Sequence, residues 1–238
     1  HPSKMDEIVK IAKKYKIHLI EDAAPAVGAK YNKKLIGTFG IAAAFSFQGA
    51  KLMVSGEGGM IITSNRSLNK KIRQLAAHGR GNNKKKGTFW IEKIGYKYSM
   101  SNIQAALCLA QFERLEELIE KKRKIFSWYE KNFKDLKKVK LNKEKKPARS
   151  IYWMTSIFIL KEKLKTKIDG LKLSRILKKK GIDTRPIFPS ISTYPMWKSK
   201  NNFFSKELSK YSLYLPSGHN LKRRDVKYIC EKIVEVLK

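Results

Sequence analysis

Lys51 stands out among the residues that could perform chemistry, because it lies on a glycine-rich turn between two apolar segments. The turn continues through residues 55–59, Ser-Gly-Glu-Gly-Gly, and an earlier apolar run ends in the carboxylate pair Glu21-Asp22. A lysine amine can form a Schiff base, and an aspartate can pair with a protonated ring nitrogen. This combination is the one that a pyridoxal phosphate enzyme needs.

The basic composition supplies the main alternative. The 238 residues include 53 lysines and arginines against 20 aspartates and glutamates, which gives a formal net charge of +33. Such a charge attracts phosphate of any kind, so a nucleic-acid-binding protein has to be considered. The basic residues are spread along the whole chain, however, and no RNA-binding signature or helix-turn-helix pattern accompanies them. Composition therefore disfavours a specific nucleic-acid binder and favours an anionic substrate.

The first part of the chain reads as α/β. Residues 5–15 have apolar side chains at helical spacing, with Ser3 as a possible N-cap, and residues 17–20 form a short apolar run typical of a buried parallel strand. Two further strands are predicted at residues 41–47 and 59–64, on either side of the Lys51 turn. Because ligands of open α/β sheets gather beyond the carboxyl ends of the strands, Asp22 and Lys51 are expected at such an edge.

The remaining part divides at a long helix. Apolar positions predict one helix from residue 101 through residue 129, capped by Ser101-Asn102, and a charged connector at residues 136–149 follows it. A strand at 151–160, a helix at 171–180 ended by Gly181, an extended stretch at 182–188 and a helix at 225–237 predict a small α+β domain. The expected domains are residues 1–130 and 131–238.

The cysteines, the apolar runs and the first residues predict where the protein is found and whether the chain is whole. Cys108 and Cys230 lie in apolar helical patterns without metal-ligand spacing, which predicts buried thiols in a reducing compartment. No apolar run approaches the roughly 18 residues that a membrane span requires, so a cytoplasmic protein without a membrane partner is expected. The chain opens at His1-Pro2 and enters a helical pattern at once, which suggests a fragment of a longer protein.

A series of ordered motifs resembles the DegT/StrS family of nucleotide-sugar aminotransferases, which have the fold type I architecture of pyridoxal phosphate enzymes. The motifs in the first half are His1-Pro2, Glu21-Asp22-Ala23-Ala24, Gly28-Ala29, Gly37-Thr38-Phe39-Gly40, Phe45-Ser46-Phe47, Lys51, Gly56-Glu57-Gly58-Gly59, Gly95-Tyr96, Met100-Ser101, Gln104-Ala105-Ala106 and Gln111. Those in the second half are Tyr152-Trp153-Met154, Thr184-Arg185-Pro186, Pro195-Met196 and Leu215-Pro216, and they resemble the branch that aminates a GDP-4-keto-6-deoxy sugar.

The resemblance implies roles for individual residues. Lys51 would bond to the cofactor and shuttle a proton, Asp22 would pair with the pyridinium nitrogen, and Ser46 would donate its hydroxyl to the cofactor phosphate. Each has a structural alternative: a strand-end carboxylate for Asp22, a local backbone bond for Ser46 and a hairpin turn for the glycines.

Substrate contacts are implied at Arg185 and His78. Arg185 could anchor an anionic group or pair with an acidic neighbour, and His78, before Gly79, could be only a loop or cap histidine.

The chain departs from the family pattern at four points. Pro25 stands where a polar side chain usually approaches the cofactor ring, and Ser192 where a histidine is common. Lys97 and Ser99 occupy a segment that usually reaches the cofactor phosphate of the partner subunit; Lys97 could still meet it as a point charge. A complete family member also has an earlier segment that helps to hold the cofactor.

The resemblance, together with the order of the predicted elements, implies a homodimeric pyridoxal phosphate aminotransferase with a partial large domain, built on a mixed, mostly parallel sheet, and a small α+β domain. It would transfer an amino group from an amino-acid donor, expected to be glutamate, to a 4-keto-6-deoxy nucleotide-diphosphate sugar for surface polysaccharide. The alternatives are a truncated, non-catalytic relative or subunit and a nucleic-acid-binding protein.

Overall fold

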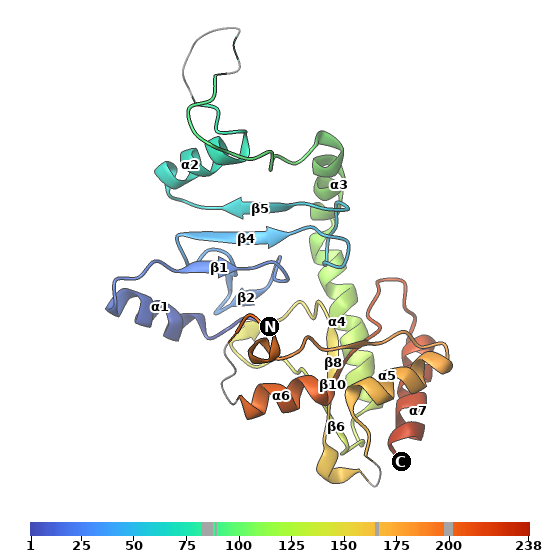
Figure 1. Cartoon of the computed structure of the whole chain (residues 1–238). Helices are drawn as coiled ribbons and strands as arrows, with labels where there is room; N and C mark the ends of the chain where they lie inside the picture. Colours follow the sequence, from blue (N-terminus) through green and yellow to red (C-terminus); the bar gives the residue numbers. More distant parts are fainter. Residues whose placement is uncertain (82–87, 89, 165–166, 198–201) are drawn as a thin grey trace. The chain divides into compact units, whose positions relative to one another are not determined.

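The computed structural model describes residues 1–81, 88, 90–164, 167–197 and 202–238. The chain forms two compact units, and each is described by itself (Figure 1). The first unit contains His1–Leu118 and Lys145–Ile151, and the second contains Ile119–Glu144 and Tyr152–Lys238. These units divide the chain at a different point from the predicted domain boundary at residue 130. The division into domains at that residue stays a prediction.

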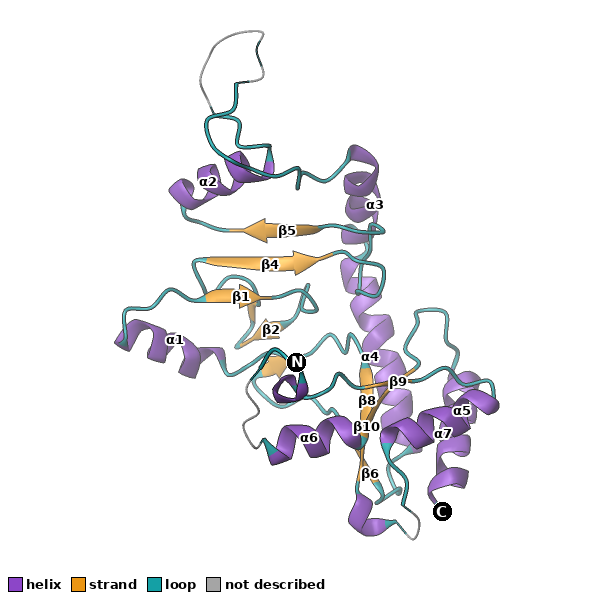
Figure 2. Cartoon of the chain, in the orientation of Figure 1, coloured by secondary structure: helices purple, strands orange, loops and turns teal. Residues whose placement is uncertain are grey.

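The first unit is built on a mixed three-stranded sheet with the order β1-β4-β5 (Figure 2). Strands β1 (Ile20–Asp22) and β4 (Ala42–Ser46) are parallel, and β5 (Gly59–Ile62) runs antiparallel to β4. The strands predicted at residues 41–47 and 59–64 are present, whereas β1 lies later than the predicted run at residues 17–20 and shares only Ile20 with it. Leu19 still contributes outside the strand, because its carbonyl accepts a hydrogen bond from the Ile41 N–H at 2.9 Å.

Two helices and a second small sheet complete most of this unit. Helix α1 (Met5–Lys14) confirms the prediction, but its N-cap is Lys4 rather than Ser3, and no side chain caps it. Helix α2 (Arg66–Ala76), capped by Asn65, was missed, although Leu68, Ile72 and Leu75 recur at helical spacing after that cap. Strands β2 (Lys30–Tyr31), β3 (Lys34–Leu35) and β7 (Ala148–Arg149) form the small sheet.

The predicted helix over residues 101–129 is two helices. Helix α3 (Asn102–Phe112) begins with the predicted Ser101 cap, which forms a full capping box with Gln104. The chain then tightens at Glu113-Arg114, where the Arg114 N–H donates to the Gln111 carbonyl at 3.1 Å, and α4 (Leu115–Asn132) follows. Neither glycine nor proline marks this break, so a pattern of apolar spacing runs through it unnoticed.

The second unit has an antiparallel sheet with the order β6-β8-β10-β9. Its strands are β6 (Val139–Leu141), β8 (Thr155–Ile159), β10 (Ser212–Leu215) and β9 (Arg185–Pro186). The helices are the main part of α4, α5 (Gly170–Lys179), α6 (Phe203–Lys210) and α7 (Arg223–Leu237), with 3-10 turns η1 (Lys161–Lys163) and η2 (Ile191–Thr193). Strand β6 lies in the predicted connector, and β10 and α6 were missed.

One continuous apolar core supports this unit and confirms the predicted α+β architecture. It joins α4, the sheet, α5 and α7 through buried residues that include Tyr129, Ile157, Leu177, Leu213 and Ile233. Cys230 lies in this core and Cys108 is buried in α3, as predicted for both thiols.

Glu21 organises the turn that covers one face of the first sheet. Its buried carboxylate accepts hydrogen bonds from the N–H groups of Gly37 at 2.7 Å, Phe39 at 2.6 Å and Gly40 at 2.8 Å. Gly37 has φ +98°, and a Cβ there would lie 2.5 Å from the Phe45 ring. The motif at residues 37–40 is thus a set of donors folded around one carboxylate.

Removal of this carboxylate should destabilise the first unit. Glu21→Ala leaves three N–H groups without their acceptor, so we expect a loss of about 2 kcal/mol or more in the free energy of unfolding. Urea denaturation of the variant, compared with the exposed control Glu113→Gln, measures the effect. Equal stability of the two variants would contradict this role for Glu21.

Lys122 is a buried cation in the second unit. Its Nζ donates to the carbonyls of Ser217 at 2.6 Å and Trp153 at 3.2 Å, and it lies 3.4 Å from Ser217 Oγ. Burial lowers the pKa of Lys122 to about 8. The lysine therefore joins α4 to two loops. Because burial disfavours a charged amine, the free energy of this arrangement depends on whether Lys122 is protonated.

Lys122 should make stability depend on pH above neutrality. Between a folded pKa of about 8 and the ordinary value of 10.5, the unfolded chain holds a proton that the folded chain has released. Stability relative to Lys122→Met should therefore rise as the pH increases through this window. Urea denaturation at the two ends of the window, with Lys131→Met as the exposed control, tests the sign; a flat or falling difference would refute it.

Candidate active site

Asp22 and Ser46 lie at the same edge and on the same face of the first sheet. In the parallel pairing of β1 with β4, Asp22 is the register partner of Ala44, two residues before Ser46. Because side chains alternate along a strand and paired residues share a face, Asp22, Ala44 and Ser46 all point to one side. A carboxylate and a hydroxyl thus meet at the carboxyl ends of adjacent strands.

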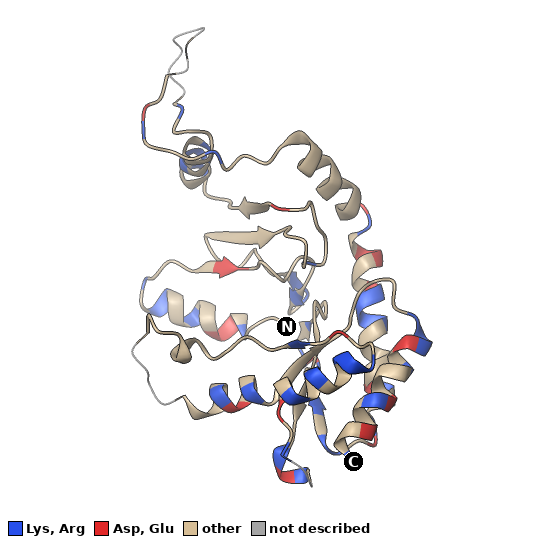
Figure 3. Cartoon of the chain, turned by 45° about the vertical axis from the view of Figure 1, so that its right-hand side comes forward, with Lys and Arg blue, Asp and Glu red and all other residues tan. Residues whose placement is uncertain are grey.

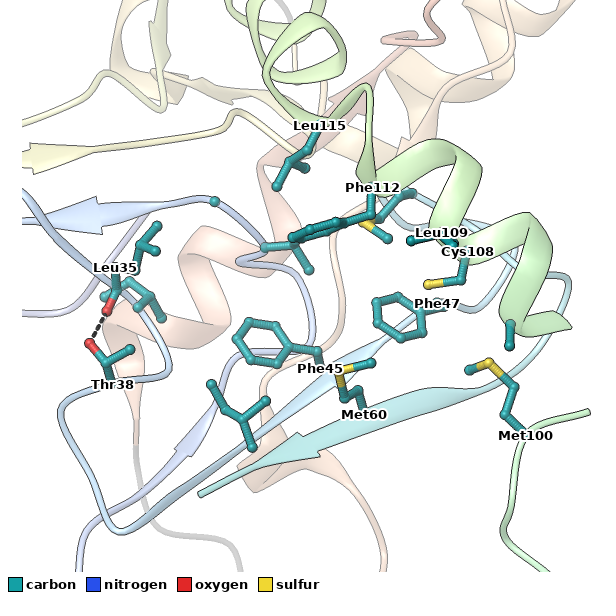
Figure 4. Close-up of a pocket in the computed structure, with 16 residues that line it drawn as sticks. Leu35, Thr38, Phe45, Phe47, Met60, Met100, Cys108, Leu109, Phe112 and Leu115 are labelled. Carbon is teal, nitrogen blue, oxygen red and sulfur yellow. Dashed lines mark hydrogen bonds between the residues drawn. The ribbon is translucent and has the colours of Figure 1, made fainter. Parts of the chain in front are cut away.

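The opposite face of this sheet is apolar. Phe45 pairs with Met60, and Phe47 continues the same face two residues later. This face, helix α3 and the turn near Leu35 enclose a cavity of about 670 Å³ (Figure 4). The cavity lining is almost entirely aliphatic, aromatic and sulfur-containing, so this cavity is a separate feature from the polar edge at Asp22.

The Lys51 loop connects β4 to β5 directly beyond Ser46. The Lys51 N–H donates to the Gln48 carbonyl at 2.9 Å, and the Ala50 N–H donates to Gln48 Oε1 at 2.9 Å. Lys51 itself is half-buried, whereas Leu52 and Met53 after it are only 4% and 1% exposed. The lysine therefore sits next to two buried anchors.

The two ends of the loop are hydrogen-bonded to each other. The Phe47 N–H donates to the Gly58 carbonyl at 2.9 Å, and the Phe47 carbonyl accepts from the Ser55 N–H at 2.8 Å. Gly56 and Gly58 have φ values of +82° and +121°, which explains why glycine is needed at both positions. Gly59 is needed for a different reason, because a Cβ there would lie 2.6 Å from the Phe45 carbonyl oxygen.

Asp22 and Ser46 each accept a hydrogen bond from a nearby backbone N–H. Asp22 is exposed, and its Oδ1 accepts from the Ala24 N–H at 3.1 Å. Ser46 Oγ accepts from the Gln48 N–H at 3.4 Å, so the local backbone bond considered for Ser46 is present but long. The Asp22 carboxylate therefore remains exposed at this edge of the sheet, with one local hydrogen bond.

His78 and Lys97 lie together after the end of α2. Residue 77 forms an isolated bridge with Lys97, and the His78 N–H donates to the Tyr96 carbonyl at 2.9 Å. His78 has φ +61°, a left-handed conformation that matches the loop alternative for this residue. Ser99 Oγ donates to the Ala76 carbonyl at 3.3 Å, which places this segment along the same helix end.

Arg185 belongs to the second unit, in β9. Its guanidinium lies 3.8 Å from the Asp183 carboxylate, and both side chains are largely exposed. The acidic neighbour considered as an alternative partner is thus present, at a distance typical of a weak surface pair. Ser192, in the same unit, lies with its Oγ 2.9 Å from Ser190 Oγ.

Three site features were missed from the sequence. Glu21 was read only as part of a carboxylate pair with Asp22, and the structure separates the two, since Glu21 binds a turn and Asp22 faces the open edge. Gln104 and Gln111 of α3 contact the Lys51 loop. The motif resemblance at these two glutamines was the only signal that could have found them.

Metal and membrane features were searched over the described ranges. They contain no cluster of three or more histidine, cysteine or acidic side chains suited to a metal ion. Among those residues, no helix has the length and apolarity to cross a bilayer.

Comparison with known proteins places the chain in a family. The model of the DegT/DnrJ/EryC1/StrS aminotransferase family matches residues 1–234. A GDP-perosamine synthase of Escherichia coli O157:H7 is 38% identical over 237 residues, which cover 99% of this chain and 62% of that protein. A putative pyridoxal phosphate-dependent aminotransferase EpsN of Bacillus subtilis is 32% identical over 92% of this chain and 56% of its own length.

A solved structure shows the same fold. The aminotransferase PseC of Helicobacter pylori, involved in the biosynthesis of pseudoaminic acid, superposes with a TM-score of 0.90 at 22% identity, over 99% of this chain and 64% of that one. This chain spans less than two thirds of the length of each of these relatives. The matches confirm the predicted fold type I architecture and the predicted cofactor class of the family. The chain belongs to the DegT/DnrJ/EryC1/StrS aminotransferase family.

Proposed function

We propose that this chain carries the lysine side of a pyridoxal phosphate site and acts in a nucleotide-sugar aminotransferase. The observation that supports this proposal most directly is the position of Asp22 and Ser46 at the carboxyl ends of β1 and β4, with the Lys51 loop directly after Ser46. An amine, a carboxylate and a hydroxyl at one strand edge match the aldehyde, ring nitrogen and phosphate of the cofactor in chemical type.

Each residue has a distinct task in this proposal. Lys51 holds the cofactor covalently at rest, and its amine on a flexible four-carbon stem accepts and returns a proton when substrate takes its place. Asp22 keeps the ring nitrogen protonated, and Ser46 donates its hydroxyl to the phosphate. The bound cofactor supplies an electron sink for the amino-transfer chemistry.

The proposed class of substrate is supported by the charge of the chain. The formal net charge of +33 favours a diphosphate-bearing sugar, and lysines and arginines occur on helices of both units (Figure 3). We assign Arg185 and His78 to the anionic substrate and Lys97 to a cofactor phosphate. The similarity to GDP-perosamine synthases supports a 4-keto-6-deoxy nucleotide sugar as acceptor and surface polysaccharide as the pathway, with glutamate as the proposed donor.

A second copy of the chain is the proposed partner. Helix α3 carries no charged side chain, and Ile103, Leu107, Leu109 and Phe112 on it are all more than half exposed. A helix without charged side chains that exposes several large apolar ones is atypical of a surface helix, which supports a homodimer that covers this part of α3. We place this enzyme in the cytoplasm.

The relatives are longer than this chain, and the sheet has an uncovered face. Ile20 and Ile61, on the same side of the sheet as Asp22, are 66% and 52% exposed. Parallel strands are normally covered on both faces, so we propose that polypeptide equivalent to the remaining part of the relatives covers this face.

The alternative is a non-catalytic relative, which Pro25 favours because it stands where the family usually has a polar side chain. A nucleic-acid-binding protein would instead bind DNA or RNA tightly, with a steep dependence on salt.

Pyridoxal phosphate should bind covalently to Lys51. Mixing it with the purified chain should produce a new visible absorbance band, because the bound aldehyde becomes conjugated to the lysine nitrogen. The band should disappear in Lys51→Ala and persist in the control Lys70→Ala, which removes an exposed lysine of α2. Absence of the band in the unmodified chain would favour the non-catalytic alternative.

Asp22 should matter for rate more than for folding. In Asp22→Asn, the ring nitrogen loses its anionic partner, so the rate at which glutamate discharges the absorbance band should fall about 100-fold. Stopped-flow absorbance measures this rate, with the exposed Asp135→Asn as control. A rate equal to that of the control would remove Asp22 from the site.

A further inference from the structure

Two glutamines of helix α3 face the loop that carries Lys51. Gln104 and Gln111 are seven residues apart, which is about two helical turns and places both on one side of the helix. Their side chains contact Val54 and Glu57, three and six residues after Lys51. The helix thus reaches the loop at two separate points.

Gln111 holds one residue of the loop by both of its backbone groups. Its Oε1 accepts from the Val54 N–H at 3.0 Å, and its Nε2 donates to the Val54 carbonyl. This two-point contact has the donor and acceptor pattern of a β-ladder and sets both distance and orientation. A carboxylate could reproduce only the first bond, and a hydrocarbon side chain neither.

Gln104 connects the start of α3 to the far end of the loop. Its Oε1 accepts from the Ser101 N–H at 3.1 Å as part of the capping box, and its Nε2 donates to the Glu57 carbonyl at 3.3 Å. The same carbonyl accepts from Ser55 Oγ at 2.7 Å. The helix cap and the loop end are therefore parts of one hydrogen-bonded cluster.

These contacts restrain the part of the loop next to the lysine. The ends of the loop are already joined through Phe47, and the buried Leu52 and Met53 anchor the segment directly after Lys51. Gln111 grips Val54 directly after the buried Leu52 and Met53. Gln111 therefore adds two directional hydrogen bonds to the apolar anchoring of the segment that follows Lys51.

We propose that Gln111 is a positioning residue for Lys51 and that Gln104 restrains the same loop at a second point, the Glu57 carbonyl. This inference rests on the proposed function of Lys51. Displacement of a reacting group by about 1 Å can reduce a rate by about 100-fold, so a loop fixed at its middle would have a large effect on chemistry without contact between Gln111 and any ligand.

The first test uses the 43 lysines of the chain as internal references. The protein is incubated with pyridoxal phosphate, reduced with borohydride, and the labelled lysines are mapped by peptide mass spectrometry. We expect preferential labelling of Lys51 in the unmodified chain. In Gln111→Met, the label at Lys51 relative to the other lysines should fall at least 10-fold, with a smaller fall in Gln104→Met.

Two further variants separate positioning from general damage. Gln74→Met removes a glutamine of α2 whose Nε2 donates to Glu92 at 3.0 Å, and it should label like the unmodified chain. Gln111→Glu keeps an acceptor for the Val54 N–H and should fall between the unmodified chain and Gln111→Met.

The second test needs no cofactor. Hydrogen exchange of the Val54 amide should be at least 10-fold faster in Gln111→Met, while the amides between β4 and β5 should keep their protection. Unchanged exchange at Val54, or unchanged preference for Lys51 in Gln111→Met, would overturn the positioning role and leave the proposed function intact. Indiscriminate labelling of the unmodified chain would contradict the proposed function, and hydrogen exchange would still decide whether Gln111 restrains the loop.

Discussion

The parallel pairing of β1 with β4 is the constraint on which the rest of the first unit depends. The register that places Asp22 beside Ala44 brings the carboxylate and the Ser46 hydroxyl to the same edge and the same face. A slip of one residue would turn every side chain of β1 to the other face and would exchange the environments of Glu21 and Asp22. The chemistry proposed for this edge therefore depends on a short ladder of hydrogen bonds.

The same register gives the two acidic neighbours opposite tasks. Glu21 points to the apolar face, where a bare carboxylate would be costly to bury, and three backbone N–H groups satisfy it. Asp22 points to the open face and stays available. The Glu21 carboxylate and the turn at residues 37–40 stabilise each other. The turn therefore stays packed against the Phe45 ring, on the opposite face of the sheet from Asp22.

Helix α3 links this arrangement to the lysine. One of its sides lines the apolar cavity, its two glutamines grip the loop, and other apolar side chains remain exposed. A single helix thereby combines packing, loop support and a surface suited to another chain. Such multiple use explains why α3 lacks the amphipathic pattern of a surface helix, since its apolar side chains lie both along the cavity and on the exposed surface.

The sequence by itself determined the nature of the elements and the candidate chemistry. Local apolar spacing was sufficient for α1, β4, α5 and α7, and the lysine with its glycines marked the loop, because these signals lie within short stretches of chain. Only the tertiary structure decided the division of labour between Glu21 and Asp22, the contacts of Gln111, the break before α4 and the place of β10 between β8 and β9. Most of these features depend on contacts between residues far apart in sequence. Local propensity reflects only neighbouring residues, so it cannot predict such contacts.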